Sequence, residues 1–279
     1  MPVRLAVFTL VDWSFTIVRE WAESEGHEIA LVVSLSGDDA APSVPRSSAS
    51  TRESVVMVVP KVRQCEATLA ELDVDLSIVF TFRRVPESVA GLARHGCVNL
   101  HPSLLPAYRG ANGYRALYEG EPVIGATLHH LTPEFDAGAI LAQTSVPTPD
   151  EVEPVTALAA LSRVATDVLT IGVPRALAGE PGDEQDEAAA TGAPPFTDDE
   201  MVLSFNVSSH AFHCRFSALT LAGKTPLVDV DGEAQPVRAI KRLGGLSAES
   251  PGIVSSGLRR ALAAVTDGVL ELELGRQPF

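Results

Sequence analysis

Short apolar runs alternate with segments of helical spacing along the first hundred residues, and this alternation constrains the fold more than any other feature. The runs are rich in Val, Ile and Leu, and they cover 3–9, 28–35, 55–59 and 76–82. The segments between them with helical spacing cover 14–25, 61–72 and 87–94. Strands that read as near-continuous apolar runs are typical of parallel sheets with helices on both faces. The pattern predicts an α/β fold with a doubly wound, mostly parallel sheet of Rossmann type.

Composition places the chain among globular proteins. It has 279 residues, of which 46% are hydrophobic and 20% are charged, so we expect one large domain or two unequal ones. The three cysteines are far apart and form neither a disulfide framework nor a zinc motif. The N-terminal apolar run is too short for a signal peptide, and we expect no apolar stretch of ~18 residues that would span a membrane. A cytoplasmic location without a membrane partner follows as an expectation.

The net charge of −15 is unevenly distributed. Residues 180–200 hold eight acidic residues and no Lys or Arg, whereas 201–279 hold eight basic and seven acidic residues. An acidic stretch that also contains Pro and Gly is typical of a solvated linker. We therefore expect a first domain over 1–179, an acidic linker over 180–200 and a second domain over 201–279.

The C-terminal residues have the pattern of antiparallel strands. The segments 227–230 and 236–240 flank Asp231-Gly232, which is a hairpin signal. Residues 269–274 alternate cleanly between apolar and polar after another Asp-Gly pair. This pattern predicts a small β-rich (OB-like) domain, a compact barrel or sandwich.

The chemistry of the first domain concentrates at the end of one strand, in the stretch 97–110. Asn99 and His101 alternate with apolar residues, so both side chains project to one side of the strand. Pro102 ends the strand, which places the two polar groups at the sheet edge where open α/β sheets bind ligands. The alternative is a strand end whose two polar residues are satisfied by nearby backbone.

Asp136 lies in a tight loop over 132–138, and a carboxylate there can orient and stabilise an imidazole on a neighbouring strand. The alternative is an Asx turn with the Ala137-Gly138 backbone. The first strand-helix turn has no glycine, so a dinucleotide fingerprint and a P-loop are both absent. His129 and His130 point to opposite faces of a strand, and we interpret His129 as a buried, satisfied histidine. His210, His213 and Cys214 have no fourth ligand nearby, so we expect no metal.

The stretch VNLHPSLLPAYRG, followed 35 residues after His101 by Asp136 in LTPEFDAG, resembles the 10-formyltetrahydrofolate-dependent formyltransferases. The resemblance covers 1–178. It implies the formyltransferase-like variant of the fold, 10-formyltetrahydrofolate as co-substrate, and a catalytic trio of Asn99, His101 and Asp136. It also implies folate contacts in two segments, made by Arg83, Arg84 and Val85 and by Thr132, Pro133, Glu134 and Phe135. The Arg pair at 83–84 and the first turn depart from the family pattern.

The residue types of the trio suit formyl transfer. An amine that attacks the formyl carbon creates an oxyanion, which an amide and an imidazole can stabilise by hydrogen bonds. Asp136 can hold the imidazole and accept the proton that the amine loses. We expect an N-formyltransferase that needs no metal. The alternatives are methionyl-tRNA formyltransferase, then a formyltetrahydrofolate hydrolase, then a non-catalytic folate-binding domain.

Charge favours a small or medium amine as the acceptor over tRNA, such as an amino acid, a sugar nucleotide or a biosynthetic intermediate. Each phosphate contact needs a Lys or Arg, yet the loop 36–53 has two Arg against three acidic residues. A basic patch remains possible from Arg238, Lys241, Arg242, Arg259 and Arg260. The candidate acceptor contacts are Ser103, Arg109, Asn112 and Tyr114. The sequence does not identify the acceptor or the oligomeric state.

Overall fold

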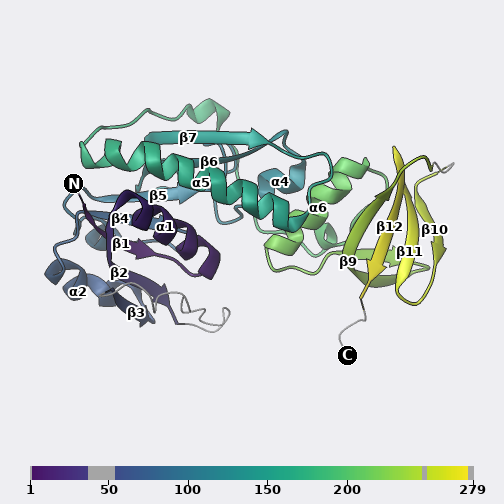
Figure 1. Cartoon of the computed structure of the whole chain (residues 1–279), viewed down its shortest axis with the longest axis horizontal. Helices are drawn as coiled ribbons and strands as arrows, with labels where there is room; N and C mark the ends of the chain where they lie inside the picture. The colour runs from purple at the N-terminus through teal and green to yellow at the C-terminus, as the bar shows by residue number, and fades with distance from the viewer. Residues whose placement is uncertain (1, 37–53, 247–249, 276–279) are drawn as a thin grey trace. The chain divides into compact units, whose positions relative to one another are not determined.

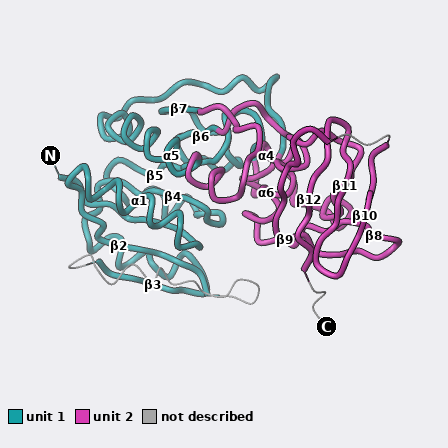
Figure 2. The backbone as a smooth tube through the Cα atoms, turned by 45° about the vertical axis from the view of Figure 1, so that its right-hand side comes forward, with its two compact units in different colours: residues 1–109, 125–145, 161–192 teal, residues 110–124, 146–160, 193–279 magenta. Residues whose placement is uncertain are grey.

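The computed structural model describes residues 2–36, 54–246 and 250–275. The loop 36–53, whose charge was used above to argue against tRNA, lies almost entirely outside the described residues. The chain divides into two compact units, which are described separately (Figure 2). Unit 1 comprises Met1–Arg109, Gly125–Ser145 and Leu161–Gly192, and unit 2 comprises Gly110–Ile124, Val146–Ala160 and Ala193–Phe279.

This division differs from the expected boundaries at 179 and 200. Segments from the middle of the chain join the C-terminal part because their apolar residues pack there: Val152 and Ala157 form a buried cluster with Cys214. The Ser217 hydroxyl also donates a hydrogen bond to the Val152 carbonyl at 2.7 Å. The first half of the acidic segment 180–200, which was expected to be a solvated linker, belongs to unit 1 and forms hydrogen bonds with its loops.

A mostly parallel sheet forms the centre of unit 1 (Figure 1), as the alternation in sequence predicts. Its described strands stand in the order β3-β2-β1-β4-β5-β6-β7. In chain order they are β1 Arg4–Phe8, β2 Glu28–Leu35, β3 Val55–Val59, β4 Leu76–Phe80, β5 Cys97–His101, β6 Val123–His130 and β7 Ile140–Pro147. Strands β1 to β5 pair in parallel, and β6 runs antiparallel to β5. The carboxyl ends of β1, β4 and β5 therefore meet at one edge, beside the point where the strand order reverses.

The helices lie close to the ranges that the periodicity predicts, except that the one expected over 87–94 is shorter. They are α1 Asp12–Glu25, the 3-10 turn η2 Val62–Cys65, α2 Glu66–Glu71, α3 Glu87–Ala90, α4 Arg115–Glu119 and α5 Pro154–Leu177. The shortest of these α-helices, α3, ends at Ala90. Helix α4 begins at Arg115, just after the Asn112 side chain accepts a hydrogen bond from the Tyr114 N–H at 3.3 Å.

Helix α5 is long and apolar enough to cross a membrane by length and composition, with a mean hydropathy of 1.4, although the sequence was expected to hold no such stretch. Its buried residues recur at helical spacing: Ala157, Leu161, Val164, Val168 and Val173. Gly172 lies so close to the sheet that an added Cβ would meet Leu128 at 2.7 Å and Ala142 at 3.1 Å. These are the features of a core helix that packs on β6 and β7.

Unit 2 combines a helix with an antiparallel sheet, as predicted for the C-terminal residues. Helix α6 (Ser209–Leu221) follows Ser208, whose hydroxyl accepts a hydrogen bond from the Ala211 N–H. The strands are β8 Leu227–Val230, β9 Glu233–Leu243, β10 Gly252–Ser256, β11 Arg260–Val265 and β12 Gly268–Leu274, in the order β10-β11-β12-β9-β8. Asp231 and Gly232 form the predicted hairpin with φ of 56° and 87°. Two short 3-10 turns precede the helix in the chain, η3 Glu187–Ala189 in unit 1 and η4 Asp199–Met201 in unit 2.

A close backbone approach shapes the loop 131–139 that joins β6 to β7. The His130 N–H donates to the Ala139 carbonyl at 3.0 Å, which folds the loop back on itself. A Cβ added to Gly138 would lie 1.8 Å from the His130 carbonyl oxygen. Only glycine fits there without a backbone shift, so Gly138 fixes the path of the loop.

We predict that Gly138→Ala lowers the free energy of unfolding by roughly 1–3 kcal/mol, the usual cost of overpacking. Gly91→Ala is the matched control, because its Cβ would meet only the Glu87 carbonyl oxygen at 3.4 Å. Denaturant unfolding of both variants measures the difference. Equal stability of the two variants would contradict the close approach.

Candidate active site

Three polar side chains converge where β5 ends, and the sequence predicted all three. Asn99 and His101 stand two residues apart on β5, and Asp136 reaches them from the loop 131–139. Asn99 Nδ2 lies 2.9 Å from Asp136 Oδ1, and His101 Nδ1 lies 3.5 Å from Asp136 Oδ2. The Asp136 side chain is 10% exposed and its φ is 51°, in the left-handed region that few non-glycine residues adopt.

Asn99 connects the carboxylate to His129, which stands directly opposite it on β6. Asn99 Nδ2 donates to Asp136 Oδ1 and also lies 3.0 Å from His129 Nε2. His129 Nδ1 donates to the His130 carbonyl at 2.8 Å, which leaves Nε2 to accept from the Asn99 amide. His129 Nε2 also lies 3.5 Å from Asp136 Oδ1.

His129 was interpreted from sequence as a buried, satisfied histidine. It is 1% exposed and both ring nitrogens have partners, yet those partners place it in the site. His129 is identified as part of the site by the pairing of β6 with β5, which sets it opposite Asn99. The alternation of residues along a single strand does not reveal this pairing.

His101 lies between a carbonyl and a carboxylate. Its Nε2 donates to the Tyr108 carbonyl at 2.8 Å, so the proton of the neutral ring is on Nε2 and the lone pair of Nδ1 faces Asp136. Burial lowers the pKa of His101, and the Asp136 charge and the Tyr108 carbonyl oppose this shift without reversing it. The ring is therefore neutral at pH 7, and the next proton it takes up goes between Nδ1 and Asp136.

The loop after β5 is held by its own hydrogen bonds. Ser103, a predicted acceptor contact, is 3% exposed and donates to the Ala107 carbonyl at 2.7 Å. Thr127 Oγ1 donates to the Ser103 carbonyl and accepts from the Leu105 N–H. Gln143 Nε2 donates to the Leu105 carbonyl at 2.7 Å. These bonds fix the path that brings the Tyr108 carbonyl to His101.

The other predicted acceptor contacts also have partners within their own units. The Arg109 guanidinium bonds to Gln185 and Glu187 in unit 1. In unit 2, Asn112 donates to the Pro194 carbonyl at 3.0 Å, and burial raises the pKa of Tyr114 to about 12. The structure thus places Ser103 and Arg109 in one unit and Asn112 and Tyr114 in the other, and their contact with an acceptor stays a prediction.

The two segments predicted to contact folate touch each other. Arg84 Nη2 donates to the Pro133 carbonyl at 2.8 Å, and its guanidinium lies 5.9 Å from the centre of the Phe135 ring. Thr132 Oγ1 donates to the Glu134 carbonyl at 3.1 Å within the loop. Val85 is buried, Arg83 is exposed, and Phe135 is 65% exposed. An aromatic ring exposed to this extent is available to stack on a flat ligand.

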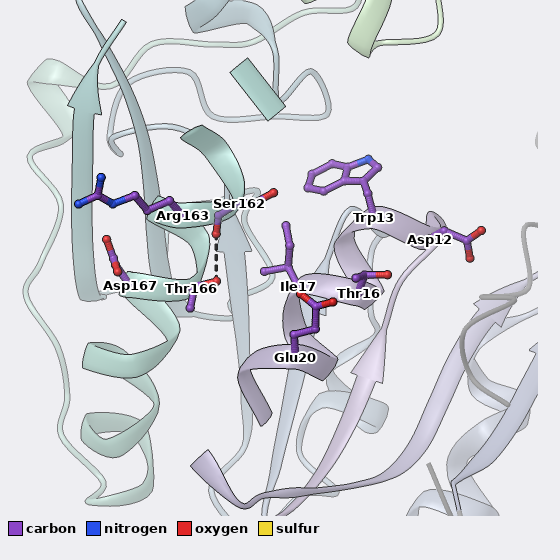
Figure 3. Close-up of a pocket in the computed structure, with 9 residues that line it drawn as sticks. All are labelled: Asp12, Trp13, Thr16, Ile17, Glu20, Ser162, Arg163, Thr166 and Asp167. Carbon is purple, nitrogen blue, oxygen red and sulfur yellow. Dashed lines mark hydrogen bonds between the residues drawn. The ribbon is translucent and has the colours of Figure 1, made fainter. Parts of the chain in front are cut away.

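A pocket of about 600 Å³ lies between α1 and α5 (Figure 3), and the sequence did not predict it. Its side chains come from the two facing helices: Asp12, Trp13, Thr16, Ile17, Glu20, Ser162, Arg163, Thr166 and Asp167. Three of them are carboxylates and one is an Arg, so the pocket carries a negative charge. Asp12 and Trp13 follow β1, so this end of the pocket lies at the carboxyl edge of the sheet.

The histidines and the cysteine of α6 have structural partners. Cys214 Sγ lies 3.5 Å from His210 Nε2, and burial raises the pKa of the thiol to about 11, so the thiol stays protonated. His213 Nδ1 donates to the Ser209 carbonyl at 2.8 Å. Among residues 2–36, 54–246 and 250–275, no three His, Cys, Asp or Glu side chains group as metal ligands.

Comparison with known proteins gives the family. A sequence model described as formyl transferase matches residues 22–169, which include Asn99, His101 and Asp136. A methionyl-tRNA formyltransferase of Levilactobacillus brevis is 31% identical over 212 residues, which are 74% of this chain and 67% of that relative.

Solved structures share the fold. HypX from Aquifex aeolicus, in complex with tetrahydrofolic acid, superposes with a TM-score of 0.66 at 16% identity over 98% of this chain and 44% of that chain. WlaRD, a sugar 3N-formyl transferase crystallised with dTDP and 5-N-formyl-THF, superposes with a TM-score of 0.67 at 11% identity over the whole of both chains. The match over 22–169 confirms the resemblance seen in the sequence: the chain belongs to the formyl transferase family, whose members transfer formyl groups as enzymes.

Proposed function

We propose that the chain moves a formyl group from 10-formyltetrahydrofolate to an amine of a small or medium metabolite. The observation that carries this proposal is the contact of Asp136 with both Asn99 and His101 at the end of β5. The family assignment supports formyl transfer, and the complexes of HypX with tetrahydrofolic acid and of WlaRD with 5-N-formyl-THF support a folate donor.

In the proposed reaction, His101 and Asp136 accept the proton that the attacking amine loses. The amine attacks the formyl carbon, and its nitrogen then holds a proton that must leave. The His101 Nδ1 lone pair and Asp136 Oδ2 face each other at 3.5 Å, so a proton taken up there is shared by the pair. The pair returns this proton to N10 of the folate as the C–N10 bond breaks. The products are the formamide and tetrahydrofolate, with no net proton taken up.

In the same step, Asn99 stabilises the oxyanion. Its two amide N–H groups donate to Asp136 and His129 before the reaction. When His101 takes up the proton, its imidazolium bonds to Asp136 Oδ2, and one Asn99 N–H turns from its resting partner to the oxyanion. A preorganised donor of this kind lowers the barrier by about 3 kcal/mol.

The folate ring would bind between Arg84 and the loop 132–135. Backbone groups at the end of a strand suit the alternating donors and acceptors of a pterin edge. The exposed Phe135 ring offers a stacking surface, and the Arg84 bond to Pro133 holds the loop in place.

We predict that Phe135→Ala weakens tetrahydrofolate binding about tenfold, as loss of one aromatic stacking contact would. The measurement is the thermal shift of the protein against tetrahydrofolate concentration, which rises with occupancy. Leu258→Ala is the control, because Leu258 is fully exposed in unit 2. If saturating tetrahydrofolate leaves the melting temperature of the unaltered protein unchanged, the folate proposal fails.

Charge supports an amine metabolite as the acceptor. The pocket between α1 and α5 has three carboxylates, Asp12, Glu20 and Asp167, and one Arg, so a ligand bound there would be a cationic amine before a phosphate-rich group. The curated relative from Levilactobacillus brevis supports the alternative, initiator methionyl-tRNA. An enzyme that docks tRNA needs several Lys or Arg contacts with phosphates.

The two acceptors are separated by one assay, in which the protein receives labelled 10-formyltetrahydrofolate with either a panel of amines or charged initiator tRNA. The panel contains amino acids, amino-sugar nucleotides and small biosynthetic amines. We predict transfer to a member of the panel, with a rate that falls little between 50 and 200 mM salt, whereas tRNA binding loses orders of magnitude over this range. Efficient, salt-sensitive formylation of methionyl-tRNA would show that the acceptor is tRNA. It would leave the fold and the proposed folate site unaffected.

A further inference from the structure

Gln185 contacts the backbone on both sides of the Asp136 loop. Its Nε2 donates to the Asp136 carbonyl at 2.8 Å and to the Gly138 carbonyl at 2.7 Å. Its Oε1 accepts from Arg109 Nε at 3.1 Å and from Nη2 at 2.8 Å. Because Arg109 can only donate, the orientation of the amide is fixed and both N–H groups face the loop.

Arg109 is held in turn by the same stretch of chain, residues 183–191, here named the strap. The guanidinium forms a two-bond pair with Glu187, at 2.9 and 2.7 Å. The Arg109 N–H donates to the Thr191 carbonyl at 2.8 Å, and the Tyr108 N–H donates to Thr191 Oγ1 at 2.9 Å. At its other end the strap pairs with β7, through Asp183 and Ile140.

The strap therefore holds both partners of His101. One partner is the Tyr108 carbonyl, whose residue bonds to Thr191, and the other is Asp136, whose backbone bonds to Gln185. Asp136 has a φ of 51°, and a conformation of this kind persists only where the surroundings hold it. The strap lies outside the residues 22–169 that match the family model.

We propose that Gln185 is a positioning residue for formyl transfer, which holds the Asp136 carboxylate against His101 Nδ1 through the backbone of the loop. This rests on the proposed role of His101 and Asp136. Gln185 touches neither substrate nor reacting atoms. Its effect is on how well the carboxylate and the imidazole stay aligned while the proton moves.

Two substitutions separate the contacts of Gln185. Gln185→Met keeps the length of the side chain and removes both donors and the acceptor. Gln185→Glu keeps the acceptor for Arg109 and removes the donors to the loop. The matched control is Gln64→Met on η2, where Gln64 Oε1 accepts only a local bond from the exposed Lys61 N–H.

We expect both Gln185 variants to lower kcat at least about tenfold while the KM for 10-formyltetrahydrofolate changes less than about threefold, since misalignment affects the reaction step. Gln64→Met should match the unaltered protein in both constants. Gln185 variants with the kcat of the unaltered protein would overturn the proposal. A rise in KM with kcat unchanged would also overturn it, because it would make Gln185 a binding residue.

A second measurement does not depend on turnover. The ring signals of His101, identified by their loss in His101→Gln, are titrated by NMR. The charged and titratable groups that face this ring are Asp136 and His129, with Arg109 and Glu187 behind Asp136. In Gln185→Met we expect His101 to titrate at lower pH than in the unaltered protein, because the carboxylate that raises its pKa is less well held.

The two measurements distinguish failure of the proposed function from failure of the proposed role of Gln185. If the unaltered protein transfers formyl groups to no amine and to no tRNA, the proposed function fails and the His101 titration alone decides the role of Gln185. An unchanged titration in Gln185→Met would show a merely structural contact and overturn the proposal, even if the variant were less stable.

Discussion

The site depends on one constraint, the left-handed turn that presents the Asp136 carboxylate to two side chains of β5. One carboxylate oxygen accepts from Asn99 Nδ2 at 2.9 Å, and the other lies 3.5 Å from His101 Nδ1. The turn exists because Gly138 allows the His130 carbonyl to approach and because Gln185 bonds to the carbonyls of Asp136 and Gly138. The backbone of the loop is thus held by contacts with other groups, and this backbone positions the Asp136 carboxylate. The charge of the carboxylate then acts on the His101 imidazole.

The sequence predicted the sheet and the trio for different reasons. Apolar runs of strand length, separated by helical segments, are sufficient to predict a parallel sheet, and two-residue spacing is sufficient to place Asn99 and His101 on one side of β5. Asp136 came from the resemblance to the family, because nothing in its local sequence distinguishes it from an Asx turn. The predicted hairpin at Asp231-Gly232 formed because both residues tolerate positive φ.

What the sequence did not predict depends on partners that lie far along the chain. His129 joins the site only through the antiparallel register of β6 against β5. Gln185 lies in a run of acidic residues with the composition of a linker, yet Arg109 gives that run a cationic anchor 76 residues away. The same long-range pairing explains why Arg109, which looked free to meet an acceptor, donates within its own chain, and why the two units divide the chain at positions that composition does not mark.

We propose that His101 and Asp136 act together as the proton acceptor, and the pH dependence of kcat in the unaltered protein and in Asp136→Asn tests this directly. Burial lowers the pKa of His101, so we expect activity to fall on acidification with a midpoint below 6.5, the ordinary value of a histidine. Asp136→Asn should lower kcat by about a hundredfold or more, whereas Asp73→Asn, at an exposed ion pair with Arg94, should not change it. Full activity of Asp136→Asn, or an acid midpoint above 6.5, would show that His101 and Asp136 are not the proton acceptor.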